Sequence, residues 1–298
     1  MTETDLSLPA RRLAAALEPF AGQVYFSREC HALYEGLGFS PSPGQMGKVA
    51  LPDGPAYFTS RGSVLGQVPG TVVAAAFGVF NPAAVMPAVD FGWSLTDAST
   101  ICDARTAGAV GQLSRILGAA PGGIERAIEL LGRAGERLRP EGRALYAGLL
   151  ALELPREPVG AAWRLADRLR EYRGDAHIAA WLDGGYDATE IGLLTELYWG
   201  LPMRTYVRTR AWSDEQLDEA ETRLIERGLV VDGAMTEAGR RSREEVEVAT
   251  DRQCQPIVDG LGDGLEELIG ILMPWDDEIR AAGGYPPAGP HTLAGRRR

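Results

Sequence analysis

The sequence is poor in the residues that build disulfides and metal sites. It contains three cysteines, Cys30, Cys102 and Cys254, and three histidines in 298 residues. The cysteines are odd in number and far apart, which argues against both a disulfide framework and a cysteine-rich metal site. We therefore expect reduced thiols, a cytoplasmic protein and no metal site.

The sequence also lacks a long uninterrupted hydrophobic run. A membrane-spanning helix needs about 20 apolar residues in succession, but the most apolar window, 68–89, is broken by Gly70, Gly78, Pro82 and Pro87. The opening residues, MTETDLSLPARRL, contain no apolar core of the kind found in secretion signals. We expect neither a membrane span nor a secretion signal.

Basic residues are fewer than acidic ones. The chain has 30 Lys and Arg against 41 Asp and Glu, which gives a formal net charge of −11. Such a surface repels phosphate backbones unless the positive side chains gather in one patch. Lys48 is the only lysine, and this preference for arginine is typical of a GC-rich bacterial genome.

Three common catalytic motifs are missing, and no cofactor can be identified. The chain contains no glycine-rich phosphate loop, no serine nucleophile elbow and no helical histidine pair at zinc-ligand spacing. What stands out instead is the segment RLREYRGDAHIAAW, where charged side chains surround a glycine in a helical context. Positions three and four apart share one helix face. Here that face consists of Arg170, Arg173, Gly174, His177 and Trp181.

Gly174 needs a reason to stand within this helix. Glycine costs a helix about 1 kcal/mol relative to alanine. Close approach of another element or of a ligand is one such reason. The segment therefore predicts a site but does not identify what binds there.

Large apolar side chains gather in residues 72–95, where alanines and glycines leave room between Phe77, Phe80 and Trp93. Helices broken by prolines could enclose an apolar cavity there, and ordinary core packing is the alternative. The preceding segment, 56–66, has strand propensity, so we expect a short hairpin that carries Arg61. This arginine either clamps an anion or stacks on an aromatic ring, or it ties the hairpin to an acidic helix. The full set that we expect to bind a ligand is Arg61, Phe77, Phe80, Trp93, Tyr172, Arg173, His177 and Trp181.

An enzymatic interpretation would rest on Arg173, Asp175 and His177. A histidine near a carboxylate can act as an oriented base, and an arginine can hold an anionic substrate. Asp175 and His177 are two positions apart on a helix and do not face each other, so we expect His177 to find its partner elsewhere, such as a carboxylate of the N-terminal half. The alternative is a buried polar network that serves only the fold.

The second half of the chain follows the order of a winged helix-turn-helix. Capping-box patterns at Asp187 and Ser213 predict two helices, 189–199 and 213–229, and a short helix is expected between them at 202–210. The segment LVVDGAMT then predicts two strands joined by a two-residue Asp-Gly turn. A long final helix follows Thr236.

These motifs carry two resemblances. The segment RLIERGLVVDGAMTEAGRR, 223–241, resembles the end of the recognition helix, the wing and the next helix of MarR-like winged-helix proteins. The wider chain, through segments such as ARRLAAALEPF, YFTSRGSVLG, REYRGDAH and WSDEQLDEAETRLIERGLV, is similar to an actinobacterial helix-turn-helix family of poorly defined function. The resemblance implies a regulator that binds DNA, and a homodimer.

The residues themselves oppose DNA binding. The recognition helix of a winged helix reads base edges with its N-terminal residues. In this chain that segment carries Asp214, Glu215, Asp218, Glu219 and Glu221. Carboxylates placed against phosphates are unfavourable, so sequence-specific DNA binding is disfavoured. A basic rim that contacts phosphate is still available from Arg204, Arg208, Arg240 and Arg241.

The sequence therefore predicts a mainly α protein. We expect a helical N-terminal domain with a short β-hairpin at 1–155, a winged-helix-like domain with a hairpin wing at 156–285 and a disordered tail at 286–298. The expected function is binding of a small apolar or aromatic molecule between the two halves, with transcriptional regulation or sequestration as the output. An enzyme on a repurposed winged-helix scaffold is the alternative.

Overall fold

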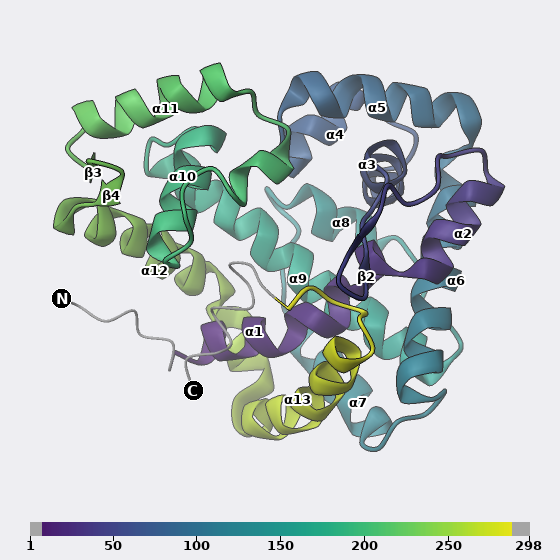
Figure 1. Cartoon of the computed structure of the whole chain (residues 1–298). Helices are drawn as coiled ribbons and strands as arrows, with labels where there is room; N and C mark the ends of the chain where they lie inside the picture. The colour runs from purple at the N-terminus through teal and green to yellow at the C-terminus, as the bar shows by residue number, and fades with distance from the viewer. Residues whose placement is uncertain (1–7, 288–298) are drawn as a thin grey trace.

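The structure is a computed structural model, which describes residues 8–287. Over these residues the chain is mainly helical with two small antiparallel sheets, which confirms the expected fold class at this level (Figure 1). All of the predicted tail except Pro286 and Pro287 lies outside the described residues.

The N-terminal half contains eight α-helices, two 3-10 helices and one hairpin among its described residues. In chain order they are α1 (Pro9–Gly22), η1 (Gln23–Phe26), α2 (Arg28–Gly36), β1 (Gln45–Met46), β2 (Val49–Ala50), α3 (Gly54–Gly62), η2 (Ser63–Leu65), α4 (Gly70–Phe77), α5 (Pro82–Leu95), α6 (Ala98–Leu117), α7 (Ile124–Gly135) and α8 (Ala144–Leu150). Side chains that accept backbone N–H groups fix several helix starts. These caps are Ser27, Asp53, Asn81 and Asp97.

The C-terminal half begins with the longest described helix. Its elements are α9 (Pro158–Asp183), α10 (Ala188–Tyr198), η3 (Val207–Arg210), α11 (Asp214–Glu226), β3 (Val230–Val231), β4 (Ala234–Met235), α12 (Glu237–Leu261), η4 (Gly262–Gly264) and α13 (Leu265–Ala281). The capping boxes expected at Asp187 and Ser213 are both formed, and the hairpin turn expected at Asp232 and Gly233 is present with both residues at positive φ.

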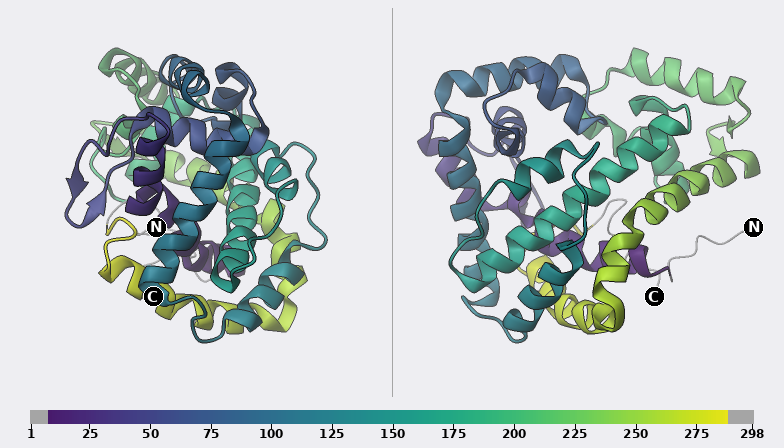
Figure 2. Two further views of the ribbon diagram at one scale, coloured as in Figure 1. Left: turned by 90° about the vertical axis from the view of Figure 1, so that its right-hand side faces the viewer. Right: turned by 180° about the vertical axis from the view of Figure 1, so that it is seen from behind.

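Helix α9 runs through the middle of the molecule (Figure 2, right). It packs against α1, α6, α7, α8 and α12, so both halves of the chain meet on it. The largest cluster of buried apolar residues accordingly includes Phe20 of α1, Leu130 of α7, Trp163 of α9 and Leu268 of α13. A second cluster surrounds α10 and α11, and a third lies among α3, α4, α5 and α8. The division into domains at residue 155 stays a prediction.

The predicted strand pair at 56–66 is wrong, because residues 54–62 form helix α3. Asp53 accepts a hydrogen bond from the Ala56 N–H group, Pro55 occupies the first turn, and Phe58 and Thr59 are buried against neighbouring helices. Capping and packing thus override the strand propensity of the aromatic residues. The hairpin of this half lies earlier, where Gln45 pairs with Ala50.

The short helix predicted at 202–210 is reduced to the four-residue η3. The buried carboxylate of Glu196 explains this. It accepts hydrogen bonds from the backbone N–H groups of Arg204, Tyr206 and Val207. These donors are satisfied without a helical turn, and Arg204 takes a positive φ of 63°.

Candidate functional site

A cavity of about 280 Å³ lies between the two halves of the chain. Its wall is formed by α1, α3, the end of α4, α9, α10, η3 and α12. Two of its sides are the polar face of α9 and the segment from α10 to η3, so the cavity touches the predicted helix-turn-helix. The volume is slightly below the range of about 300–1,000 Å³ that is typical of ligand sites.

Five of the eight residues expected to bind a ligand line this cavity. They are Arg61, Phe77, Phe80, Arg173 and His177. The first three come from α3, the last residue of α4 and the α4–α5 connection, whereas the last two come from α9. The structure thus brings together residues that are up to 116 positions apart, from Arg61 to His177.

Trp93, Tyr172 and Trp181 do not line the cavity. Trp93 donates its indole N–H to the Val68 carbonyl at 2.7 Å. Tyr172 packs edge-on against Tyr146 with ring centroids 5.0 Å apart, because one residue along α9 turns the side chain by about 100° away from Arg173. Trp181 lies one turn beyond His177 and is buried in the apolar cluster around α10 and α11.

Gly174 borders the cavity, as does Arg170. A Cβ atom at Gly174 would meet only the Glu171 Oε2 atom within 4 Å among the described residues, at 3.5 Å. No other helix or strand in this part of the chain therefore requires a glycine at this position by close approach. The remaining interpretation is that Gly174 keeps the cavity open.

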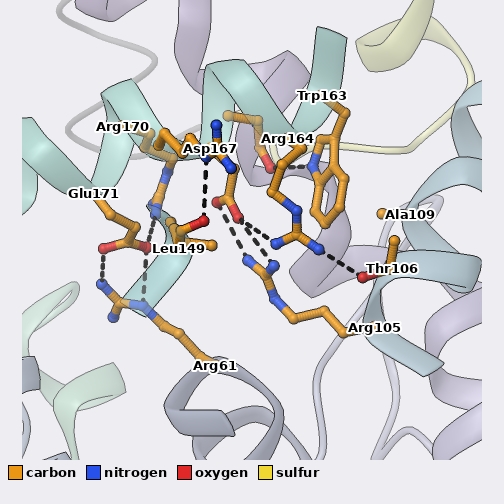
Figure 3. Close-up of polar contacts among 12 residues, drawn as sticks. Arg61, Arg105, Thr106, Ala109, Leu149, Trp163, Arg164, Asp167, Arg170 and Glu171 are labelled. Carbon is orange, nitrogen blue, oxygen red and sulfur yellow. Dashed lines mark hydrogen bonds and ion pairs between the residues drawn. The ribbon is translucent and has the colours of Figure 1, made fainter. Parts of the chain in front are cut away.

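At one end of the cavity, arginines and glutamates neutralise one another. Glu171 accepts hydrogen bonds from Arg61 at 2.8 and 3.1 Å and from Arg170 at 2.9 Å (Figure 3). Arg170 also pairs with Glu18 at 2.9 Å. Burial raises the pKa of Glu171, but the Arg61 and Arg170 guanidinium groups outweigh it and lower the pKa to about 2. This carboxylate is therefore ionised, and it accepts hydrogen bonds from the two arginines and from the Tyr25 hydroxyl group.

The other end of the cavity repeats this arrangement on α12. Glu247 lies 3.0 Å from Arg173 and 2.7 Å from Arg243, and Arg11 of α1 pairs with Asp251 and Glu244. Burial raises the pKa of Glu247, yet the two arginines hold it well below its usual range.

Asp175 and His177 point to different surroundings, as their spacing on the helix predicts. Asp175 is buried and its Oδ2 atom accepts the Tyr146 N–H group at 3.1 Å, away from the cavity. Burial raises its pKa to about 7. His177 lines the cavity, and its Nδ1 atom lies 3.1 Å from the Thr250 Oγ1 atom of α12. This contact comes from the C-terminal half of the chain.

The acidic residues of α9 do not assemble a metal site. Asp167 accepts two hydrogen bonds from Arg105, at 2.9 and 3.2 Å, in a fully buried pair (Figure 3). Within residues 8–287 no group of three His, Cys, Asp or Glu side chains is placed to hold a metal ion.

The arginines expected to contact DNA fall into two groups. Arg204 pairs with Asp218 and Glu221, both at 2.6 Å, and Arg208 pairs with Asp214 at 2.7 Å. All three carboxylates belong to α11, so these arginines are neutralised by the helix that would enter the groove. In contrast, the two arginines at the start of α12, Arg240 and Arg241, make no ion pair within the described part of the chain.

The sequence patterns did not assign Arg11, Glu18 or Arg210 to the cavity. Arg11 and Glu18 interrupt the buried face of α1, and two buried charges on an otherwise apolar helix face were a usable signal. Arg210 carried no such signal, because it reaches the cavity only through the irregular path of the chain after α10.

No helix in the described part of the chain is long and apolar enough to cross a membrane. A model of a helix-turn-helix family matches residues 10–286. No curated protein and no solved structure matches the chain.

Proposed function

Because the chain belongs to this helix-turn-helix family, we propose that it is a ligand-binding member in which a small apolar or aromatic molecule occupies the cavity and acts on the helix-turn-helix segment. The observation that carries the proposal is the composition of the cavity wall. Phe77 and Phe80 of the N-terminal half face the polar side of α9, and the segment after α9 closes the remaining side.

The closing side consists of residues from α10 and η3. Ile191, Gly192 and Thr195 of α10 and Tyr206 and Val207 around η3 all line the cavity. A molecule between α9 and α10 therefore contacts the helix-turn-helix segment directly, without an intervening layer. If α10 adopts two positions, a ligand in the cavity makes different contacts with it in each position. Such a difference in contacts is the physical requirement for a ligand to shift the balance between two conformations.

Two contacts would pass such a change on to α11. Val207 packs so closely on Gly192 that a Cβ atom there would lie 2.6 Å from the valine, so η3 and α10 move together. Asn81, at the start of α5, donates to the Ala211 carbonyl at 3.0 Å and to the Gln216 side chain at 3.1 Å. The aromatic wall of the cavity is thereby joined to the first turns of α11.

The proposal includes the finer features that the resemblances imply. We take α10 and α11 as the helix-turn-helix, the β3–β4 hairpin as the wing and α12 as the helix after the wing in MarR-like proteins. A homodimer, a cytoplasmic location and an actinobacterial origin are part of the same hypothesis. Their support is the order of elements and the sequence motifs.

Transcriptional regulation is the output that the family favours. The charges of α11 work against base readout, since its exposed face carries Asp214, Glu215 and Glu219. Phosphate contacts from Arg240 and Arg241 would supply affinity without reading sequence. Sequestration of the ligand is the alternative output for the same cavity.

An enzyme remains the alternative class of function, with Arg173 and His177 in the cavity. Asp175 takes no part in it, because its carboxylate is bound to the Tyr146 N–H group. Ligand binding does not require a catalytic base or a carboxylate that orients it, and it is therefore the function that we propose.

The test fills the cavity at Gly174. The neutral fluorescent probe phenylnaphthylamine is titrated into the wild type, Gly174→Ala and Gly174→Leu. We expect saturable binding to the wild type and affinity at least about tenfold lower for Gly174→Leu, because the new side chain occupies the cavity. Gly174→Ala should still bind, since its Cβ atom meets one atom at 3.5 Å.

Gly270→Leu is the matched control. Gly270 lies exposed within α13, and a Cβ atom there meets nothing within 4 Å among residues 8–287. This variant should bind the probe as the wild type does. Equal probe affinity of folded Gly174→Leu and wild type would contradict the proposed function.

A further inference from the structure

The charges around the cavity are not balanced. Six arginines line it, namely Arg11, Arg61, Arg170, Arg173, Arg210 and Arg243, together with only three glutamates, Glu18, Glu171 and Glu247. This excess is unusual for a chain with a formal net charge of −11. The arginines that lack a carboxylate partner should therefore reveal what the cavity is built to hold.

Five of the six arginines are neutralised by ion pairs. Arg61 and Arg170 pair with Glu171 and Glu18, whereas Arg11, Arg173 and Arg243 pair with carboxylates of α12. The carboxylates of these pairs are Glu18, Glu171, Glu244, Glu247 and Asp251. Five arginines thus face five carboxylates.

Arg210 is the exception among the arginines of the cavity wall. Within residues 8–287 no carboxylate lies at ion-pair distance from it. Its guanidinium group lies 4.6 Å from the Phe80 ring centroid and 4.5 Å from the Tyr206 centroid, and it donates a hydrogen bond to the Tyr206 hydroxyl group. The cavity therefore carries one uncompensated positive charge, held between two aromatic rings.

The aromatic surroundings define the rest of the ligand. Phe77 and Phe80 lie with centroids 6.0 Å apart, and Phe80 packs edge-on against Phe58 at 5.1 Å. Ile178 and Ile191 complete an apolar lining beside them. A planar apolar body placed here would lie next to Arg210, which offers planar hydrogen-bond donors to an acidic group.

We infer that the ligand of the proposed function is a small aromatic monoanion whose acidic group binds Arg210. This inference rests on the proposed function and adds the chemical class of the ligand. Arg210 ends η3, and its carbonyl accepts the Asn81 N–H group at 2.9 Å, so an anion captured here binds directly to the connection between α10 and α11. Carboxylic and sulfonic acids share this chemistry.

A matched pair of probes tests the charge. Anilinonaphthalene sulfonate differs from phenylnaphthylamine by one sulfonate group. We expect the wild type to bind the sulfonate about tenfold or more tightly, and the advantage to shrink as salt is added. Arg210→Gln should remove this advantage, so that the ratio of the two probe affinities falls to about one.

Two variants serve as controls. Arg208→Gln removes the other arginine of η3, which is paired with Asp214, and should leave both affinities unchanged. Arg210→Lys keeps the charge and should keep most of the preference for the sulfonate, which separates charge from loss of the packing on Phe80.

The outcomes separate the two proposals. If the wild type binds both probes equally, or if folded Arg210→Gln keeps the preference for the sulfonate, this inference is overturned and the cavity remains a neutral ligand site. If Gly174→Leu binds the neutral probe like the wild type, the proposed function itself fails. If Arg210→Gln does not fold, the wild type and Arg210→Lys provide the test. The inference is overturned if the wild type shows no preference for the sulfonate, or if folded Arg210→Lys loses that preference.

Discussion

Asp167 and Asp175 lie two turns apart on α9, and both are buried, but their carboxylates have different partners. Asp167 faces the Arg105 guanidinium group through two hydrogen bonds. The Asp175 carboxylate is held by the neutral Tyr146 N–H group, and burial raises its pKa from 3.8 to about 7. The raised pKa means that the folded protein keeps a proton on Asp175 that the unfolded chain releases.

The first prediction concerns the pH dependence of stability. Because the folded-state pKa is above the unfolded one, the contribution of Asp175 is fully present below pH 4 and is lost as pH rises to about 7. The loss amounts to about 4 kcal/mol. Asp175→Asn removes this charge, so it should raise the free energy of unfolding at pH 8 by about 2 kcal/mol after allowing for the buried amide group. Urea denaturation of the wild type and the variant at pH 4 and pH 8 measures this difference in the free energy of unfolding.

Asp167→Asn is the matched substitution on the same helix. It leaves Arg105 buried without its counter-charge, which should cost about 3–5 kcal/mol at pH 8. Loss of stability in Asp175→Asn at pH 8, comparable with that of Asp167→Asn, would show that Asp175 is ionised and stabilising in the folded protein.

At the residue scale, the sequence predicted side chains that share a helix face but not those that meet across helices. Arg173 and His177 were placed together because they are four positions apart on α9. The pairing of Arg61 with Glu171 depends instead on the tertiary fold, which brings the two side chains together over 110 positions of sequence. Arg210 depends on an irregular connection that Glu196 holds in place, and no periodicity describes such a segment.

Helices α2 and α6 cross at a contact that only glycine permits. A Cβ atom at Gly108 of α6 would lie 2.5 Å from the Cys30 sulfur and 2.6 Å from the Cys30 backbone. The Ser27 hydroxyl group, which caps α2, also donates to the Gly108 carbonyl at 3.2 Å. Backbone atoms cannot give way as a flexible side chain can, so the two helices would have to separate.

The second prediction compares two glycines on α6. Gly108→Ala should lower the free energy of unfolding by about 1–3 kcal/mol, because overpacking forces the helices apart. Gly111→Ala, one turn later, meets only the Glu29 side chain among the described residues, at 3.5 Å, and should raise it by up to about 1 kcal/mol through helix propensity. Thermal denaturation of the two variants measures the difference, and equal melting temperatures would contradict the close crossing.

At the element scale, local signals located most helices and failed where packing decided. The capping boxes at Asp187 and Ser213 and the turn at Gly233 were readable because their chemistry is contained in four residues. Helix α3 was misassigned because its Tyr57 and Phe58 favour strands in isolation, while their burial in the aromatic cluster is decided by α4 and α5.

At the scale of the whole molecule, the proposed regulator combines a formal net charge of −11 with few unpaired arginines among those expected to contact phosphate. The ion pairs of Arg204 and Arg208 with α11 remove two of the four arginines that were expected to contact phosphate. The remaining two, Arg240 and Arg241, lie at the start of α12 directly after the β3–β4 hairpin. Any affinity for DNA should therefore come from this small region and depend strongly on salt.

The third prediction concerns the dependence of DNA affinity on salt. It is measured by titrating a fluorescent duplex of arbitrary sequence with the protein at salt concentrations from about 50 to 200 mM. We expect binding only at the low end of this range, because the net charge of −11 opposes it. Replacing Arg240 and Arg241 together by alanine should reduce the slope of log affinity against log salt by about 2, since each lost phosphate contact releases one counterion fewer. Replacing Arg204 and Arg208 together should leave the slope unchanged, because their charges are already compensated on α11.

The reverse pattern would mean that the pairs on α11 open when DNA binds. Absence of binding even at about 50 mM salt would instead favour sequestration as the output of the cavity.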